Sequence, residues 1–372
     1  MLRALLRQFD TPLPEVDFRR CLRSRDVNAG TDRCTICSAV CPQAAVTFSA
    51  GVQLNAGSCT SCGVCAAACP TEAITDPRQQ RTLLEGNRRI RTVSVGCRLG
   101  SNDGGSWSCP VQAVCGLSWR FVAAAALLCP TRRVLLDCRN CDSCTHGPGT
   151  APVADAARRA TTFLAALGLS CSIEVVTDST SSDNPGAVSR RLFLGTALGL
   201  AGNTARRTPL ACGLPQAPQK SVRGLLWKAA LEAHSPADNH DAAPASREAC
   251  SPWGSFTVSS DCTGCGDCAL ICPWQAWHIA TSADTRTILF SMWRCRNCGY
   301  CVSRCPRNAI RRTSEVIPRP QTRVQTLATV PVPRCRRCKK SYVELFGGLC
   351  HNCTKQTSLA EAAAYFVANG EK

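Results

Sequence analysis

Hydrophobic and polar positions in the middle of the chain follow the pattern of alternating strands and helices. Within residues 91–177, short runs rich in β-branched residues (RTVSVGC, VQAVCG, RRVLLDC, CSIEVVT) alternate with apolar runs at helical spacing (SWRFVAAAALLC, ADAARRATTFLAALG). Strands that alternate with helices usually pair in parallel, because each helix returns the chain across the sheet. This part therefore predicts a small parallel α/β layer.

A cysteine-based pattern repeats on both sides of this layer. Four segments end in Cys-Pro, two variable residues, Ala and an apolar residue; they span 34–46, 59–74, 262–277 and 295–310. Their pairing predicts two duplicated domains. We expect a multidomain α+β fold. Its predicted parts are a front domain (1–82), the α/β layer (88–178), a linker with a helix at 221–234 (179–249), a back domain (250–318) and a C-terminal module with a helix at 359–369 (331–372).

Thirty cysteines among 372 residues need a chemical explanation. Secreted disulfide scaffolds are usually short, and Arg3, Arg7 and Asp10 interrupt the apolar core that a signal peptide would need. Clustering in CxxC pairs favours shared metals over disulfides. No apolar run approaches the about 18 residues of a membrane span. We therefore expect a metal-binding protein of the cytoplasm, where thiols stay reduced.

The formal net charge of +17 would suit acidic partners or nucleic acid. Of the 43 basic residues, however, only six are Lys, and Ala is abundant, which is more typical of a bias in coding composition. Charge by itself does not establish a binding groove.

Three segments carry the full spacing CxxCxxCxxxCP. The cysteines of these segments are Cys59, Cys62, Cys65 and Cys69; Cys262, Cys265, Cys268 and Cys272; and Cys295, Cys298, Cys301 and Cys305. Three thiolates on one tight loop and a distant fourth suit an iron–sulfur cluster. On these motifs the chain resembles the bacterial dicluster 2[4Fe–4S] ferredoxin family over about residues 21–80 and 250–315.

The resemblance implies crossed ligation, in which the fourth cysteine of each run binds the other cluster of its pair. Four [4Fe–4S] clusters would then be held by these groups: Cys21, Cys34, Cys37 and Cys69; Cys59, Cys62, Cys65 and Cys41; Cys262, Cys265, Cys268 and Cys305; Cys295, Cys298, Cys301 and Cys272.

The first of these groups departs from the family pattern. Thr31 occupies the first motif position, and Cys21 is the substitute, reached through the inserted segment RSRDVNAGTDR. The alternative is a three-iron cluster held by Cys34, Cys37 and Cys69, with Cys21 free.

The α/β layer has seven cysteines of its own between 97 and 144, three of them at the ends of predicted strands (Cys97, Cys115, Cys138). Ligands gather at the carboxyl ends of parallel strands. With the run CRNCDSC, this part loosely resembles the small [2Fe–2S] subunit of methyl-viologen-reducing hydrogenase. The resemblance implies a fifth metal site, one [2Fe–2S] cluster, at Cys97, Cys115, Cys138 and Cys141 or Cys144. The alternatives are packing roles, above all for Cys109 and Cys129, and a reactive thiol set.

The C-terminal module resembles a zinc ribbon, with Cys335, Cys338, Cys350 and Cys353 as four thiolates for one structural zinc. Rubredoxin-type iron is the alternative. His351 lies inside the second CxxC pair, where it is either a solvated side chain or a replacement ligand.

Ser189–Leu194 (SRRLFL) looks like a twin-arginine export signal, although it stands in mid-chain. We expect the start of a buried helix there instead. A translation start near residue 180 would reverse this interpretation for the back half.

The function indicated is electron transfer: a polyferredoxin-like relay that works as a subunit of an oxidoreductase more than as an enzyme. Family resemblance implies redox partners with acidic docking surfaces, such as a molybdopterin oxidoreductase, a hydrogenase or a heterodisulfide-reductase-like complex. A redox- or metal-sensing nucleic-acid-binding protein is the second hypothesis, which scarce aromatic residues (5%) disfavour. The third is an enzyme that reduces disulfides through Cys141 and Cys144.

Overall fold

The computed structural model divides into two compact units, Met1–Pro252 and Trp253–Lys372, which are described separately. The residues described are 13–25, 34–49, 51–85, 91–98, 108–177, 221–233, 251–282, 284–313, 319–332, 334–339 and 352–356. The expected export-like motif at 189–194 and the helix expected at 359–369 lie outside these residues.

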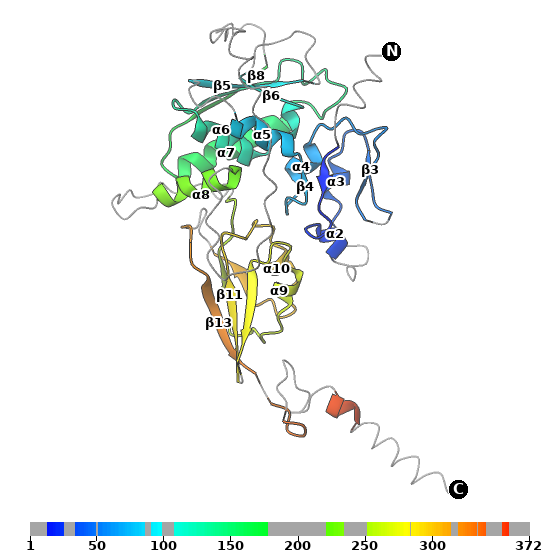
Figure 1. The fold of residues 1–372 in the computed structure, drawn as a ribbon, viewed down its shortest axis with the longest axis vertical. Coiled ribbons are helices and arrows are strands. Elements are labelled where there is room, and N and C mark those ends of the chain that lie inside the picture. The colour runs from blue at the N-terminus through cyan, green and yellow to red at the C-terminus, as the bar shows by residue number, and fades with distance from the viewer. Residues whose placement is uncertain are drawn as a thin grey trace, which may run out of the picture. The chain divides into compact units, whose positions relative to one another are not determined.

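The front part of the first unit consists of short strands and helices around cysteine-bearing loops (Figure 1). Its antiparallel strand pairs are β1 (Glu15–Val16) with β4 (Ile74–Thr75), and β2 (Val46–Thr47) with β3 (Gln53–Leu54). Its helices are α2 (Leu22–Arg25), α3 (Ile36–Ala39), α4 (Val64–Ala68) and α5 (Pro77–Glu85). The apolar core of this part includes Val46, Val52 and Ile74 together with the buried Cys37 and Cys65. Thiols and hydrophobic side chains therefore share one small core.

The α/β part of the same unit is a four-stranded sheet in the order β6-β5-β7-β8. All three neighbouring pairs are parallel. The strands are β5 (Thr92–Cys97), β6 (Cys109–Val111), β7 (Arg133–Asp137) and β8 (Ser172–Val176). The helices are α6 (Trp119–Leu128), α7 (Ala151–Ala166) and α8 (Val222–Ala233), the last close to the predicted 221–234. Figure 1 shows these helices together on one face of the sheet.

Helix α6 is the centre of this layer because it is apolar on nearly every side. Ser118 caps its first turn by accepting a hydrogen bond from the Phe121 N–H (3.3 Å). Val122 is fully buried and Trp119 packs against Phe163 of α7, with ring centroids 5.4 Å apart. A helix buried all round fixes the positions of the loops before and after it.

The second unit is built on an antiparallel sheet in the order β10-β11-β13. These strands are β10 (Trp277–Thr281), β11 (Thr285–Phe290) and β13 (Gln325–Pro331); a further antiparallel pair joins β9 (Phe256–Val258) to β12 (Ile310–Arg312). The short helices are α9 (Asp267–Ile271) and α10 (Tyr300–Ser303). Phe256, Trp277 and Phe290 form an aromatic core, with ring centroids 4.8 to 5.6 Å apart. Burial of large rings stabilises a unit with few long elements.

Candidate metal centres

The Cys-Pro-x-x-Ala segments form the same turn four times. In each turn the cysteine sulfur accepts a hydrogen bond from the backbone N–H of the alanine. The four bonds are Ala45 to Cys41 (3.3 Å), Ala73 to Cys69 (3.2 Å), Ala276 to Cys272 (3.3 Å) and Ala309 to Cys305 (3.3 Å). Each alanine is 1% exposed, so a larger side chain would not fit. This explains why the alanine recurs in every repeat.

The residue before each of these alanines adopts the left-handed conformation. The residues and their φ angles are Ala44 (46°), Glu72 (53°), Gln275 (50°) and Asn308 (50°). A non-glycine residue is strained in this region. The turn that points the N–H at sulfur therefore costs backbone energy at all four sites.

The CxxC loops repeat a second geometry at the first cysteine. The N–H two residues later points at its sulfur: Ser61 to Cys59 (3.4 Å), Gly264 to Cys262 (3.4 Å) and Asn297 to Cys295 (3.3 Å). A left-handed glycine then starts a short helix that carries the third cysteine. Backbone N–H donors aimed at sulfur favour the thiolate, the form that binds iron. The donor set of these loops fits iron–sulfur clusters.

The structure brings together the thiols of the second front group. Burial, and then the neighbouring thiols of Cys62, Cys59 and Cys41, raise the pKa of Cys65 to about 12. Cys41 comes from the other repeat, as crossed ligation requires.

Both groups of the back domain are assembled in the same crossed way. Burial raises the pKa of Cys268 to about 12, and its thiol neighbours are Cys265, Cys262 and Cys305. Cys301 has a pKa raised by burial and then by Cys295, Cys298 and Cys272.

The irregular first front group is also brought together. Burial, followed by the thiols of Cys34, Cys21 and Cys69, raises the pKa of Cys37 to about 11. Cys21 is buried and lies directly before α2. Thr31 lies outside the described residues. With Cys21, this group therefore has four thiols, as the three regular groups do.

Cysteines of the α/β part gather at the carboxyl edge of its sheet. Cys97 ends β5, and Cys138 directly follows β7. Cys138 and Cys141 form a hydrogen bond through their sulfurs, which raises the pKa of Cys138 and lowers that of Cys141. Cys97 lies close enough to interact electrostatically with Cys138 and with Cys115.

One prediction for this part was wrong. Cys115 was expected at the end of a strand, but β6 ends at Val111 and Cys115 lies in the 3-10 helix η1 (Val114–Gly116). Val114 and Leu117 are buried, so the apolar residues that suggested a strand instead form a turn that packs on the core. The chain still places Cys115 beside Cys97.

Two further cysteines of the α/β part are packing residues. Cys109 is 4% exposed and Cys129 is 2% exposed, and the Cys129 sulfur donates to the Arg91 carbonyl oxygen (2.9 Å). Cys144 is half-buried, and its sulfur accepts the His146 N–H (3.4 Å).

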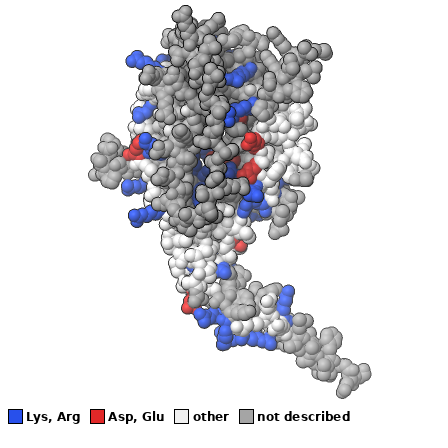
Figure 2. Space-filling model, viewed as in Figure 1, with Lys and Arg blue, Asp and Glu red and all other residues white. Residues whose placement is uncertain are grey.

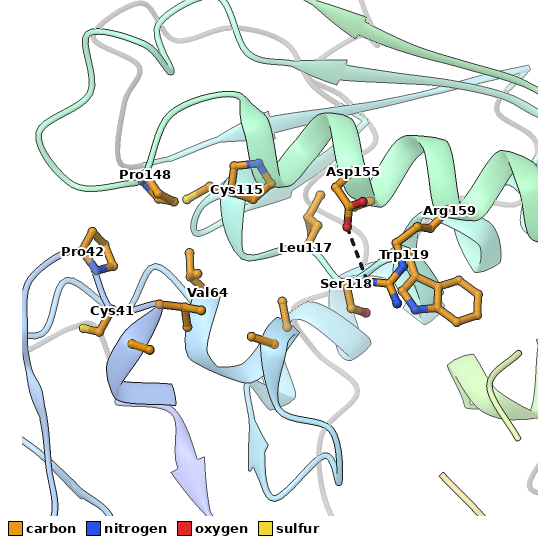
Figure 3. Close-up of a pocket in the computed structure, with 16 residues that line it drawn as sticks. Cys41, Pro42, Val64, Cys115, Leu117, Ser118, Trp119, Pro148, Asp155 and Arg159 are labelled. Atoms are coloured by element: carbon orange, nitrogen blue, oxygen red, sulfur yellow. Dashed lines mark hydrogen bonds and ion pairs between the residues drawn. The ribbon is translucent and has the colours of Figure 1, made fainter. Parts of the chain in front are cut away.

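A cavity of about 500 Å³ lies between helices α3 and α4 of the front part and the start of α7 (Figure 3). Its lining is mostly small and apolar, with Cys41 and Cys115 among the lining residues. Arg159 pairs with Asp155 on one side (3.4 Å). Sequence patterns give no sign of this cavity, because it forms between two parts of the chain.

The C-terminal module brings three thiols within metal distance. The sulfur atoms of Cys335, Cys338 and Cys353 lie within 4.8 Å of one another. Cys350 and His351 lie outside the described residues. A compact thiol set of this size suits a single ion, which is smaller than a cubane cluster. Exposed Arg334, Arg336 and Lys339 surround the first knuckle, and Figure 2 shows Lys and Arg gathered there.

Two arginines contact the iron-site loops: Arg296, which the sequence places inside a CxxC pair, and Arg286, which no motif indicates. Arg286 donates from Nη1 to the carbonyl oxygen of Gly264 in the Cys262 loop (2.9 Å). The guanidinium carbon of Arg296 lies 3.6 Å from the centroid of the Trp274 ring. The position of Arg296 in its motif does not reveal Trp274 as its partner, and Arg286 belongs to no motif.

Comparisons with known proteins agree with this geometry in two segments. Residues 256–306 match the family described as 4Fe–4S dicluster domain, and residues 52–75 match the 4Fe–4S binding domain. No curated protein matches the chain. Two 4Fe–4S ferredoxin-type domains are therefore present. Among the described residues, no helix has the length and apolar character needed to cross a membrane.

Proposed function

We propose that this chain, which carries two ferredoxin-type domains, relays single electrons through four [4Fe–4S] clusters. The supporting observation is that four groups of thiols come together in the crossed arrangement, with backbone N–H donors aimed at their sulfurs. A [4Fe–4S] cluster supplies a one-electron couple whose potential depends on such hydrogen bonds and on nearby charge. The chain's own contribution is to hold, bury and polarise each site.

The relay works within a larger oxidoreductase complex. Arg296, Arg304 and Arg307 stand within two residues of cysteines of the back groups, where positive charge favours the reduced form and an acidic partner. A molybdopterin oxidoreductase, a hydrogenase or a heterodisulfide-reductase-like complex would supply or accept electrons. The proposed setting is the cytoplasm, and the chain acts as an electron-transfer subunit.

Two further metal sites complete the proposal. The α/β part would hold one [2Fe–2S] cluster at Cys97, Cys115, Cys138 and Cys141, whose thiols interact with one another. The C-terminal module would hold one zinc, which organises a segment too small for a core of its own.

Metal analysis of the protein purified without oxygen tests the proposal. Four cubanes alone predict about sixteen irons per chain, and the α/β cluster raises this to about eighteen, with one zinc. A three-iron cluster in the first group would lower the count by one, to about fifteen irons without the α/β cluster or about seventeen with it. That count, together with the EPR signal of an oxidised three-iron cluster, would show that Cys21 is not a ligand of the first group. Little iron with several zincs would overturn the electron-transfer function.

Substitution of the C-terminal thiols tests the zinc site separately. Cys335→Ser should remove the zinc and leave the iron content unchanged. A loss of one iron with no change in zinc would instead identify a rubredoxin-type site. Cys171→Ser, which changes a cysteine of the α/β part outside the proposed groups, is the matched control.

A further inference from the structure

The sulfur atoms of Cys62 and Cys115 meet where the front part contacts the α/β part. Cys62 belongs to the second front group, and Cys115 belongs to the group at the sheet edge. The Cys115 thiol hydrogen-bonds to the Cys62 sulfur, which lowers the pKa of Cys62 and raises that of Cys115. Cys115 also interacts with Cys97 and Cys141. The two thiol groups are therefore in direct contact at one pair of sulfurs.

The main chain at Gly116 lies close against the main chain at Cys62 and Gly63. A Cβ atom at Gly116 would lie 1.9 Å from the Cys62 carbonyl oxygen and 2.9 Å from the Gly63 carbonyl carbon. Only a residue without a side chain permits this approach. Gln79 adds a hydrogen bond from Nε2 to the Gly116 carbonyl oxygen (3.3 Å). The contact is thus made by the main chains of both parts.

The loop after Cys144 holds the two parts together on a second side. Its carbonyl oxygens at Thr145 and His146 accept hydrogen bonds from Gln43 Nε2 (2.8 Å) and Thr60 Oγ1 (3.4 Å) of the front part. Farther along, a Cβ at Gly147 would lie 2.9 Å from the Cys115 sulfur. This loop therefore contacts Cys115 and both repeats of the front part.

The cavity gives independent evidence that the two groups adjoin. Cys41, which completes the second front group, and Cys115 both line it (Figure 3). One cysteine of each group therefore lines the same cavity, although the two cysteines come from different parts of the chain.

We propose that these two thiol groups form one coupled redox pair, joined at Cys62 and Cys115. The inference rests on the proposed function, because it requires a cluster in each group. One electron would pass between the two sites with no bond formed or broken and no proton transferred. The second front group, not the first, is then the point where electrons enter or leave the α/β part.

Magnetic coupling in the full chain tests this pairing. Cys59→Ser changes a ligand of the second front group other than Cys62. Serine ligation should shift the EPR signal of that cluster and so identify it. After reduction with dithionite, the tagged signal should relax rapidly because a second paramagnet adjoins it. Adding Cys97→Ala, which offers no ligand atom in place of the thiolate, should remove that paramagnet and lower the half-saturation power of the tagged signal several-fold.

The control adds Cys129→Ala, which changes a buried thiol at the end of α6 outside the group; it should leave the relaxation rapid. Equal relaxation in all three proteins would overturn the pairing and leave the proposed function standing. The absence of an iron–sulfur centre in the α/β part would likewise overturn the pairing and leave the proposed function standing. Loss of every [4Fe–4S] signal from the unsubstituted protein would instead overturn the proposed function. A relaxation change confined to a Cys34→Ser tag would assign the contact to the first front group and overturn the inference.

Discussion

The guanidinium carbon of Arg296 lies 3.6 Å from the centroid of the Trp274 ring. Trp274 follows the Cys272-Pro pair, and Arg296 lies between Cys295 and Cys298, so both residues adjoin thiols of one crossed group. Arg296 also donates from Nη1 to the Arg294 carbonyl oxygen (3.1 Å), which holds its charge in place. A fixed positive charge stabilises the reduced, more negative state of a nearby cluster.

Replacing this charge should lower one reduction potential. Arg296→Gln should shift the potential of the Cys295 group downward by tens of millivolts, since one positive charge is removed at short range. Redox titration followed by EPR measures the shift. Exposed Arg323→Gln serves as the control with the same charge change and should leave the potentials nearly unaltered. An upward shift in Arg296→Gln would contradict the electrostatic argument.

A side chain at Gly116 should separate the front part from the α/β part. Gly116→Ala places a Cβ 1.9 Å from the Cys62 carbonyl oxygen, so main chain must move. We expect a loss of about 1–3 kcal/mol in the free energy of unfolding, as for other overpacked positions. Denaturant unfolding of the metal-loaded protein measures it. Gly57→Ala, which meets only the flexible Asn55 side chain, should cost far less. Equal losses in both variants would show that the contact is loose.

The fourth ligand of the α/β site can be distinguished by paired substitutions. Cys141 hydrogen-bonds to Cys138 through its sulfur, whereas Cys144 accepts the His146 N–H. Cys141→Ser should therefore disrupt the proposed two-iron centre, and Cys144→Ser should retain it. Visible circular dichroism and iron content measure the outcome. The opposite result would assign Cys144 as the ligand and Cys141 as its neighbour.

Loading with iron should depend on pH. Burial raises the pKa of Cys65 and of Cys268 from 9.0 to about 12, so both thiols are protonated in the metal-free protein near neutral pH. Each must release its proton to bind iron, and the loaded form therefore carries fewer protons. Raising the pH from about 7 to about 9 should lower the iron and sulfide needed for reconstitution, with measurable proton release. A yield independent of pH would contradict this.

The raised pKa of these thiols also affects the stability of the metal-free fold, which a higher pH should lower. Below pH 9.0 the thiols of folded and unfolded chains are both neutral, so their burial carries no ionisation penalty. As the pH rises from 9.0 toward 12, the unfolded chain ionises first, and the stability of the metal-free fold falls. Thermal unfolding of metal-free protein across this range measures the loss.

The thiol groups could be anticipated from sequence because their ligands lie at short, fixed spacings. The crossed partner, such as Cys41 beside Cys65, was implied by the resemblance to the dicluster ferredoxin family. The substitute Cys21 could also be named, since it is the nearest free cysteine upstream of the gap at Thr31. Parallel pairing of the middle strands followed from their alternation with helices.

Features that depend on packing between distant segments were not predictable in this way. VQAVC reads as a strand by composition, but Cys115 lies in a 3-10 turn because the turn buries Val114. The contact between Cys62 and Cys115 depends on how two parts of the chain dock. A lone glycine such as Gly116 carries no periodicity that would reveal its neighbour. The arginine contacts to Trp274 and Gly264 likewise arise only in three dimensions.

Strand β13 connects the Cys262 loop mechanically to the C-terminal knuckle. Val330 near its end lies against Gly264, where a Cβ would come within 2.6 Å of the Val330 side chain, and Arg286 of β11 pairs with Val330 in register. Five residues later the same chain reaches Cys335. A displacement of Cys335 would therefore be transmitted along β13 to a side chain that touches the Cys262 loop.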